Sequence, residues 1–208
     1  MKAVIGLGNP GREYELTRHN AGFLAIDVAA DLLGASFSKR QCRGLLAEAR
    51  LRGERVALLK PQTYMNLSGQ AVLELIQWYK LEPEEVFILS DDIDLPQGVL
   101  RIRAKGGAGT HNGWRSILEV CGHTDFPRGR IGIGAPPRQW ELKDWVLSRW
   151  DQDPQADATQ AAIELAGKAA VSFLENGIQF AMNQFNITSR PRKHDTDTEN
   201  QPDEQKPL

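Results

Sequence analysis

The sequence is poor in cysteine and has no long hydrophobic run. Its 208 residues include only two cysteines, Cys42 and Cys121, too few for a disulfide framework or a cysteine-based metal site. We therefore expect two reduced thiols without a function in a cytoplasmic protein. No apolar stretch approaches the length of a membrane span. The opening Met1–Ile5 leads straight into an expected strand, so we also expect no signal peptide.

The sequence also lacks the excess positive charge that is typical of nucleic-acid-binding proteins, since its formal net charge is −2. The charges are unevenly distributed, however. Residues 191–208 hold three bases and five acids, whereas residues 101–138 hold seven bases and two acids, which gives a local charge of +5. This stretch could bind phosphate, although composition alone favours an ordinary solvated surface.

The spacing of apolar residues predicts one α/β domain. Strands that alternate with helices are typical of a three-layer sandwich, in which helices flank a mixed, largely parallel sheet. We expect this domain to span residues 1–189, and the Pro-, Asp- and Thr-rich residues 190–208 to form a disordered acidic tail. Strands are expected near 3–7, 44–51, 55–60, 86–89, 98–103 and 131–133, and helices near 20–33, 68–79 with Ser68 as N-cap, 112–121, after Pro154, and 177–186.

The segment Gly6–Gly11 has the GxGxxG form of a dinucleotide-binding loop but the wrong neighbours for one. Such a loop opens directly into a helix, and an acid follows at the end of the next strand. Here Pro10 interrupts the loop, and the first helical pattern begins only after Asn20. These features argue against a nucleotide cofactor. We interpret the loop as a mount that presents Asn9 close to His19.

Polar residues follow four of the expected strands, and sites in open α/β sheets lie beyond the carboxyl ends of strands. A histidine can accept a proton from water near neutral pH, and an aspartate can fix its tautomer. Asparagine amides can stabilise an oxyanion. Without a Gly-x-Ser-x-Gly segment or an activated cysteine, we expect direct attack by water. The four segments are Asn9 with His19, Thr63–Asn66, Asp91–Asp94 and Thr110–Gly113.

Each of these segments has an alternative interpretation when it is taken alone. Asp91, Asp92 and Asp94 could form a turn or bind a metal, but no histidine or cysteine is near them in sequence and the spacing is not that of a calcium loop. His111 could be a second base, and its place at a helix start slightly favours a structural role. A single histidine beside a glycine-rich loop is commonly structural.

Taken together, these segments resemble the bacterial peptidyl-tRNA hydrolase family. The resemblance spans about residues 2–186, and its blocks follow the order that they have in the family. The matching blocks are Gly6–Gly11, Tyr14 and Thr17–Gly22; Lys60–Gly69; Asp91–Gly98; and His111–Gly113 with Phe126–Gly134.

The resemblance implies hydrolysis of the ester that joins a peptide to the 3′-terminal ribose of tRNA, without metal or cofactor. It implies that His19 is the general base and that Asp91 orients it. We expect a monomer that acts on peptidyl-tRNA and has no membrane partner. The resemblance further implies substrate contacts from Asn9, Tyr14, Met65, Asn66 and Asn112, and contacts to tRNA phosphate from Arg103 and Arg130, assisted by Lys105 and Arg128.

Two positions depart from the family's usual pattern. Thr110 replaces a glycine, and because a β-branched residue disfavours positive φ, we expect a slightly altered loop. Arg103 stands where lysine is common, and arginine keeps the charge that a phosphate requires. The alternatives to an esterase are a catalytically inactive RNA-binding relative with the same fold, and a nucleotide-dependent oxidoreductase.

Overall fold

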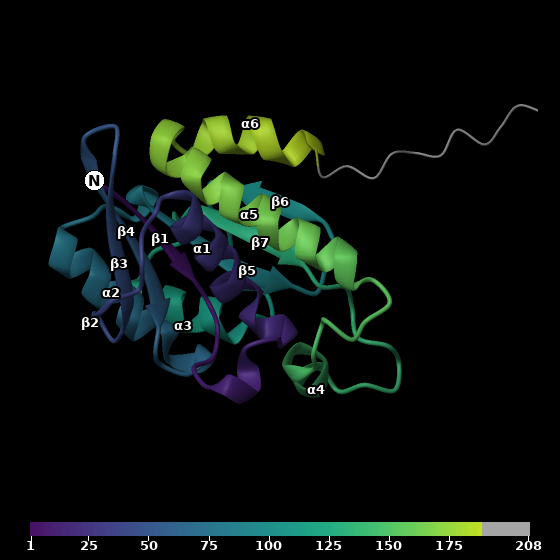
Figure 1. Ribbon diagram of the computed structural model, residues 1–208. Helices are drawn as coiled ribbons and strands as arrows, with labels where there is room; N and C mark the ends of the chain where they lie inside the picture. Colours follow the sequence, from purple (N-terminus) through teal and green to yellow (C-terminus); the bar gives the residue numbers. More distant parts are fainter. Residues whose placement is uncertain (189–208) are drawn as a thin grey trace, which may run out of the picture.

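One seven-stranded sheet lies between two layers of helices in the computed structural model, which describes residues 1–188 (Figure 1). The order of strands across the sheet is β2-β3-β4-β1-β5-β7-β6. The strands are β1 (Lys2–Gly6), β2 (Lys39–Gln41), β3 (Gly44–Leu51), β4 (Glu54–Pro61), β5 (Val86–Asp92), β6 (Leu100–Arg103) and β7 (Arg128–Gly132). The α-helices are α1 (Ala21–Leu32), α2 (Ser68–Tyr79), α3 (Asn112–Cys121), α4 (Leu142–Leu147), α5 (Ala156–Asn176) and α6 (Ile178–Thr188).

The direction of the strands confirms a mixed, largely parallel sheet. The central strands β4, β1, β5 and β7 are parallel to one another, whereas β3 is antiparallel to β4 and β6 is antiparallel to β7. Because β2 is antiparallel to β3, it runs in the direction of the central strands. Only β3 and β6 therefore oppose the common direction.

The two faces of the sheet carry separate apolar cores, which confirms the three-layer sandwich. Helices α1, α5 and α6 cover one face, and α2 and α3 cover the other (Figure 1). Alternate residues of β1 contribute to each core, with Val4 on the first face and Ile5 on the second. The run Val86–Leu89 is fully buried because β5 is central and covered on both faces, as its continuous apolar sequence predicts.

Two glycines bring the start of α1 against the ends of β1 and β5. A Cβ atom on Gly22 would lie 2.4 Å from the carbonyl oxygen of Leu89 and 2.6 Å from the amide nitrogen of Leu7. A Cβ atom on Gly6 would lie 2.2 Å from the carbonyl oxygen of Gly22. These contacts leave no room for a side chain. The loop that carries His19 is consequently held close to the strand ends.

An amide side chain from α6 satisfies the outer edge of the sheet at β6. The backbone N–H of Ile102 donates to Asn186 Oδ1 at 2.8 Å, and Asn186 Nδ2 donates to the carbonyl oxygen of Ile102 at 3.1 Å. One asparagine thus replaces the hydrogen bonds that a further strand would make at this position. Unpaired edge groups are templates for intermolecular strand pairing, and this contact removes two of them.

Most expected helices and strands are present, with a few differences. Strand β7 starts at Arg128 rather than Ile131, and β2 and α4 were not expected. The expectation that Ser68 is an N-cap is wrong: Ser68 is the first residue of α2, and its hydroxyl donates to the Met65 carbonyl oxygen at 2.8 Å. Between residues 1 and 188, each helix lacks the length or the hydrophobicity of a membrane span. The expected tail, 190–208, lies outside the described residues.

Candidate active site

A cleft of about 1180 Å³ lies beyond the carboxyl ends of β1, β4 and β5. The chain passes from β1 to β4 on one side and later to β5 on the other, so the cleft is at a topological switch point of the sheet. Of the residues expected at the site, Tyr14 alone does not line the cleft. The cleft is lined by Asn9, His19, Met65, Asn66, Asp91, Asn112, Arg103, Lys105, Arg128 and Arg130, together with Asp92, His111 and the α4 residues Leu142 and Val146.

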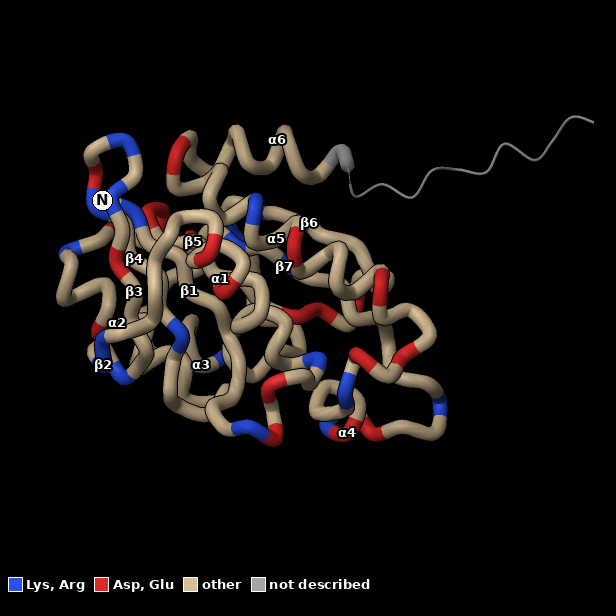
Figure 2. Tube along the Cα trace, viewed as in Figure 1, with Lys and Arg blue, Asp and Glu red and all other residues tan. Residues whose placement is uncertain are grey.

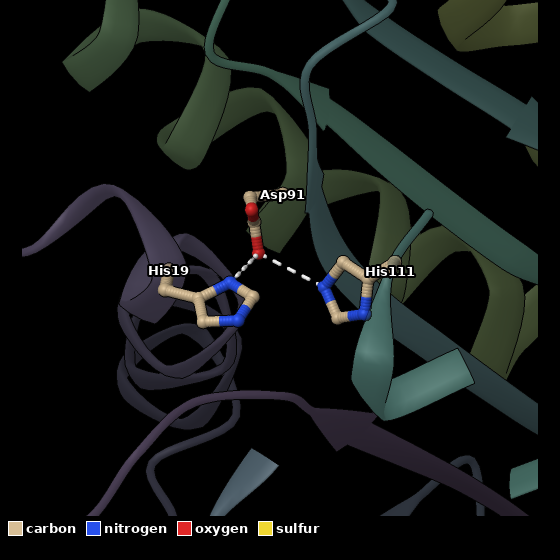
Figure 3. Close-up of side chains that lie close together, drawn as sticks. All are labelled: His19, Asp91 and His111. Atoms are coloured by element: carbon tan, nitrogen blue, oxygen red, sulfur yellow. Dashed lines mark hydrogen bonds and ion pairs between the residues drawn. The ribbon is translucent and has the colours of Figure 1, made fainter. Parts of the chain in front are cut away.

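The centre of the cleft is an aspartate shared by two histidines (Figure 3). His19 lies in the single-turn helix η2 (Arg18–Asn20), Asp91 lies near the end of β5, and His111 directly precedes α3. His19 Nδ1 is 2.9 Å from Asp91 Oδ1, and His111 Nε2 is 3.0 Å from the same oxygen. The two ring centroids are 5.0 Å apart. The expected pairing of His19 with Asp91 is therefore present in the geometry, and His111 is an additional partner.

The hydrogen bonds of His111 determine its tautomer. The backbone N–H groups of Gly113 and Trp114 donate to His111 Nδ1 at 3.1 and 3.3 Å, so this nitrogen must carry a lone pair. The proton is then on Nε2 and is donated to Asp91. His111 also caps the N-terminus of α3 through these bonds. The structural role at a helix start is confirmed, and a free second base is not what this geometry provides.

His19 is oriented differently from His111. Its Nδ1 donates to Asp91, which leaves the lone pair on Nε2, and that atom has no hydrogen-bond partner among residues 1–188. Burial disfavours the imidazolium, but the charge of Asp91 and its hydrogen bond outweigh burial and raise the pKa of His19. Burial alone would raise the pKa of Asp91, but the two histidines outweigh burial and lower it. The cluster thus holds an ionised carboxylate beside a basic imidazole.

The same three side chains have the composition of a two-histidine, one-carboxylate metal site, but their proton arrangement does not suit a metal. A metal on His111 Nε2 would require a proton on Nδ1, because a metal-ligating histidine donates its other ring N–H. That proton would point at the backbone N–H groups of Gly113 and Trp114. The hydrogen bonds at α3 therefore favour the expected interpretation of these residues as a proton-transfer group.

Asn9 is held by its backbone and its side-chain oxygen. Its N–H donates to Asn20 Oδ1 at 2.8 Å, and Asn20 Nδ2 returns a bond to the Asn9 carbonyl oxygen at 3.0 Å. The backbone N–H of Met65 donates to Asn9 Oδ1 at 2.9 Å. The remaining polar group of the side chain, Nδ2–H₂, has no partner among the described residues and belongs to the cleft lining. Asn9 therefore presents two fixed donors.

The other expected substrate contacts differ in exposure. Asn66, in the single turn η3 (Met65–Leu67), and Asn112, at the start of α3, are exposed at the cleft. Met65 is 4% exposed and lies below them. Tyr14 is half-buried in the turn η1 (Arg12–Tyr14), where its carbonyl oxygen accepts the hydroxyl of Thr17 at 2.8 Å. The local geometry of Tyr14 gives it a role in the turn before His19 rather than a place in the cleft.

Three cations lie along one side of the cleft. Arg103 and Lys105 are exposed, and Lys105 is 3.8 Å from Asp125. Arg130 Nε donates to Asp92 Oδ2, and its Nη2 is 3.8 Å from Asp94 Oδ2. Both acidic and basic residues lie around α4 (Figure 2). The cleft therefore has a cationic side, although Arg130 shares its charge with two carboxylates.

Arg128 differs from these three cations because it is buried, with an exposure of 3%. Its guanidinium carbon is 3.7 Å from the centre of the Trp114 ring, and Nη1 donates to the Gly107 carbonyl oxygen at 2.7 Å. Burial, followed by the charge of Arg130, lowers the pKa of Arg128 to about 10. Because the guanidinium of Arg128 is buried and already hydrogen-bonded within the protein, it is poorly placed for the expected contact with phosphate. The geometry favours a role in holding the glycine-rich loop before His111.

The threonine at position 110 does not strain this loop. Gly109, one residue earlier, takes the positive φ of +57°, whereas Thr110 is not among the residues with positive φ. Thr110 is also exposed. Its β-branched side chain is therefore compatible with the turn into α3.

A family model and the most similar curated relatives indicate the same family. The model of a family described as peptidyl-tRNA hydrolase matches residues 3–195. The chain is 48% identical over 187 residues to the peptidyl-tRNA hydrolase of Chloroflexus aggregans, which covers 89% of this chain and 99% of the relative. It is 45% identical over 186 residues to that of Brevibacillus brevis, with 89% and 98% covered.

A solved structure adds the same relationship in three dimensions. The peptidyl-tRNA hydrolase of Acinetobacter baumannii superposes with a TM-score of 0.82 at 36% identity, over 89% of this chain and 94% of that one. The sheet order, the cleft at the strand ends and these similarities have a common explanation. The chain belongs to the peptidyl-tRNA hydrolase family.

Proposed function

We propose that this protein hydrolyses the ester between a peptide and the 3′-terminal ribose of tRNA, which releases free tRNA and free peptide. One observation supports the proposal: His19 lines the cleft, and its Nδ1 is 2.9 Å from Asp91 Oδ1, so that Nε2 is left free to act as a base. A base with this geometry can take a proton from water, and an ester carbonyl is a suitable electrophile for that water. The reaction needs no metal and no cofactor.

His19 is the general base in this proposal, and Asp91 is the residue that orients it. As water loses its proton to His19 Nε2, the imidazolium that forms is stabilised by the ionised Asp91. The free Nδ2–H₂ group of Asn9 is placed to donate to the carbonyl oxygen as it gains charge. Asn66 and Asn112 have exposed side-chain amides that can hydrogen-bond to the peptide and to the 3′ end of the tRNA. Met65 forms the apolar floor of the cleft.

The cations along one side of the cleft are proposed to bind tRNA phosphate. The same cleft is lined by His19 and by Arg103, Lys105 and Arg130. A phosphate near the acceptor end of the tRNA could therefore contact these cations while the ester lies beside His19. We assign Arg128 to the support of this surface because it is buried. We propose that a monomer acts on peptidyl-tRNA in the cytoplasm.

The decisive experiment is a hydrolysis assay with N-acetylated aminoacyl-tRNA as the substrate. We expect the purified protein to release N-acetyl-amino acid, with or without a chelator in the buffer. An inactive RNA-binding relative would bind the same tRNA and release nothing. That result, obtained with folded protein, would refute the proposed function.

Selection against free aminoacyl-tRNA is the next property to test. We propose that Asn66 recognises the first peptide bond, which a free α-ammonium group lacks. Asn66→Ala should then narrow the difference in kcat/KM between N-acetylated and free aminoacyl-tRNA. An unchanged ratio would show that another group makes the distinction.

A further inference from the structure

Arg18, the residue before the proposed base, is a buried cation that the chemistry above does not use. It is 3% exposed, and burial lowers its pKa even though Asp153 acts in the opposite direction. A buried charge is costly unless it is paired and hydrogen-bonded. The contacts of Arg18 therefore indicate what its burial achieves.

All of these contacts go to one segment of the chain, residues 145–153. Arg18 Nη1 donates to Ser148 Oγ at 2.6 Å and to the Arg149 carbonyl oxygen at 2.9 Å, and Nη2 forms an ion pair with Asp153. The guanidinium carbon lies 3.8 Å from the centre of the Trp145 ring. A planar guanidinium can make these in-plane bonds and stack on a ring at the same time.

The backbone of the same two segments is also paired. The N–H of Arg18 donates to the Ser148 carbonyl oxygen at 3.0 Å, and the N–H of Trp150 donates to the Leu16 carbonyl oxygen at 3.1 Å. Thr17 and Arg149 form an isolated antiparallel bridge between these bonds. The chain before His19 and the chain after α4 thus form a small two-stranded contact, with the Thr17–Arg149 pair at its centre and Arg18 at one end.

Helix α4 turns opposite faces to Arg18 and to the cleft. Leu142, Lys143, Val146 and Leu147 line the cleft, at the spacing of one helical face. Trp145 is 8% exposed, stacks on Arg18, and donates from Nε1 to the Gly134 carbonyl oxygen at 2.9 Å. In Figure 1, α4 lies beside the chain that precedes α1 and away from the sheet layers. The wall formed by α4 is therefore attached through Trp145 and Arg18.

We propose that Arg18 is a positioning residue that couples the α4 wall of the cleft to the turn carrying His19. The inference rests on the proposed function, because it concerns how that substrate and base are held together. Weakening the Arg18 contacts should loosen α4, which raises KM because α4 lines the cleft. It should also lower kcat because His19 is the next residue, and small displacements of a reacting group are costly.

Two aspartates in the same turn provide a matched test. Asp153 pairs with buried Arg18, whereas Asp151, two residues earlier, pairs at the surface with Arg149. Asp153→Asn should lower kcat/KM by about 10-fold, with contributions from both constants. Asp151→Asn removes the same charge and should stay within about two-fold, as is usual for a surface pair. Arg18→Lys keeps the charge but loses the planar guanidinium, so its kcat/KM should fall at least as far as that of Asp153→Asn.

The measurements separate positioning from stability. Kinetics are recorded well below the melting temperature of each variant, together with hydrogen–deuterium exchange of residues 142–150. If Arg18 couples the two segments, the variants should show faster hydrogen–deuterium exchange in residues 142–150 and unchanged exchange in the strands of the sheet. If Asp153→Asn and Arg18→Lys only lower the melting temperature and leave kcat and KM within two-fold, the inference is wrong. Loss of activity without faster exchange at 142–150 would also overturn it. Inactive unaltered protein would instead refute the proposed function.

Discussion

The two sides of the cleft are built in different ways. On the histidine side, the side chains of His19, Asp91 and His111 are 10%, 2% and 12% exposed, and their polar atoms are joined by hydrogen bonds. On the cationic side, Arg103 is exposed, and the Lys105 side chain is 73% exposed with one ion-pair partner at 3.8 Å. A buried network fixes geometry, whereas exposed charges attract a ligand through a field that salt screens.

Two neighbouring residues of one strand, Asp91 and Asp92, belong to different sides of the cleft: one to the proposed catalytic side and the other to the proposed binding side. Asp91 and Asp92 are consecutive in β5, and alternate side chains of a strand point in opposite directions. Asp91 bonds to the histidines, and Asp92 bonds to Arg130. Changes on the histidine side should therefore appear in kcat and in the pH profile, and changes on the cationic side should appear in KM and in its salt dependence.

The largest effect is expected for His19→Ala. Removal of the base should lower kcat by about 10³-fold, while tRNA binding stays within about two-fold because the cations are untouched. Single-turnover hydrolysis and filter binding measure the two quantities. His123→Ala is the matched control, since His123 is exposed and does not line the cleft. Near-normal kcat in His19→Ala would disprove the assignment of the base.

Asp91→Asn should lower kcat by about 10²-fold and also shift the pH profile. The charge of Asp91 raises the pKa of His19, and only neutral His19 can accept a proton, so the acid limb of the unaltered protein should lie above the ordinary histidine value of about 6.5. Without that charge, burial lowers the pKa, and the limb should move to lower pH. If the acid limb of the pH profile does not move, then Asp91 does not control the pKa of the catalytic base.

His111→Asn should move the acid limb in the opposite direction. Asparagine can still cap α3, but its shorter side chain cannot reach Asp91 in place of His111 Nε2. Asp91 then loses one donor, its negative charge is less stabilised, and its attraction for protonated His19 increases. We expect a higher acid limb and a loss of about 10-fold in kcat. A limb that moves downward would contradict the proposed sharing of Asp91.

Arg130→Ala and Arg103→Ala should each raise KM by about 10-fold and leave kcat within about two-fold. The increase should be larger at low salt, because each phosphate contact releases counterions. Steady-state kinetics at several salt concentrations test this directly. If the KM of the variants and of the unaltered protein depends on salt to the same degree, then these arginines are only part of the solvated surface.

The smallest effect is expected for Thr110→Gly. Because Gly109 already takes the positive φ and Thr110 is exposed, a glycine at position 110 should change kcat/KM by less than about two-fold. A larger gain would show that the threonine constrains the loop that ends at His111.

Much of this arrangement follows from local sequence patterns. The continuous apolar run at Val86–Leu89 predicts a central strand, and the rule for strand ends then brings Asp91 and His19 to one edge. The ends of α3 agree with the expected range 112–121, because the change from a glycine-rich loop to an apolar helical period is abrupt. Such features depend on nearby residues, which a sequence displays directly.

The unexpected features depend on distant residues. Helix α4 has only six residues, and its tryptophan is buried by Arg18, which is more than 120 positions away in sequence. Strand β7 begins with Arg128. A charged residue is more typical of a loop than of a buried strand, and the contacts with Trp114 and the Gly107 carbonyl oxygen that bury Arg128 are made by residues distant from it in sequence. The second bond of Asp91, to His111, requires the cap geometry of α3. None of these contacts has a periodic signal in the sequence.

The contact of Asn186 with β6 has a consequence for the order of folding during synthesis. β1 is made first and pairs with β4 and β5, which emerge much later, while Ile102 at the edge must wait for a residue 84 positions downstream. Until α6 leaves the ribosome, the backbone of β6 is open to pairing with another chain. Asn186→Ala should consequently increase aggregation of newly made protein more than it reduces the melting temperature of the folded form.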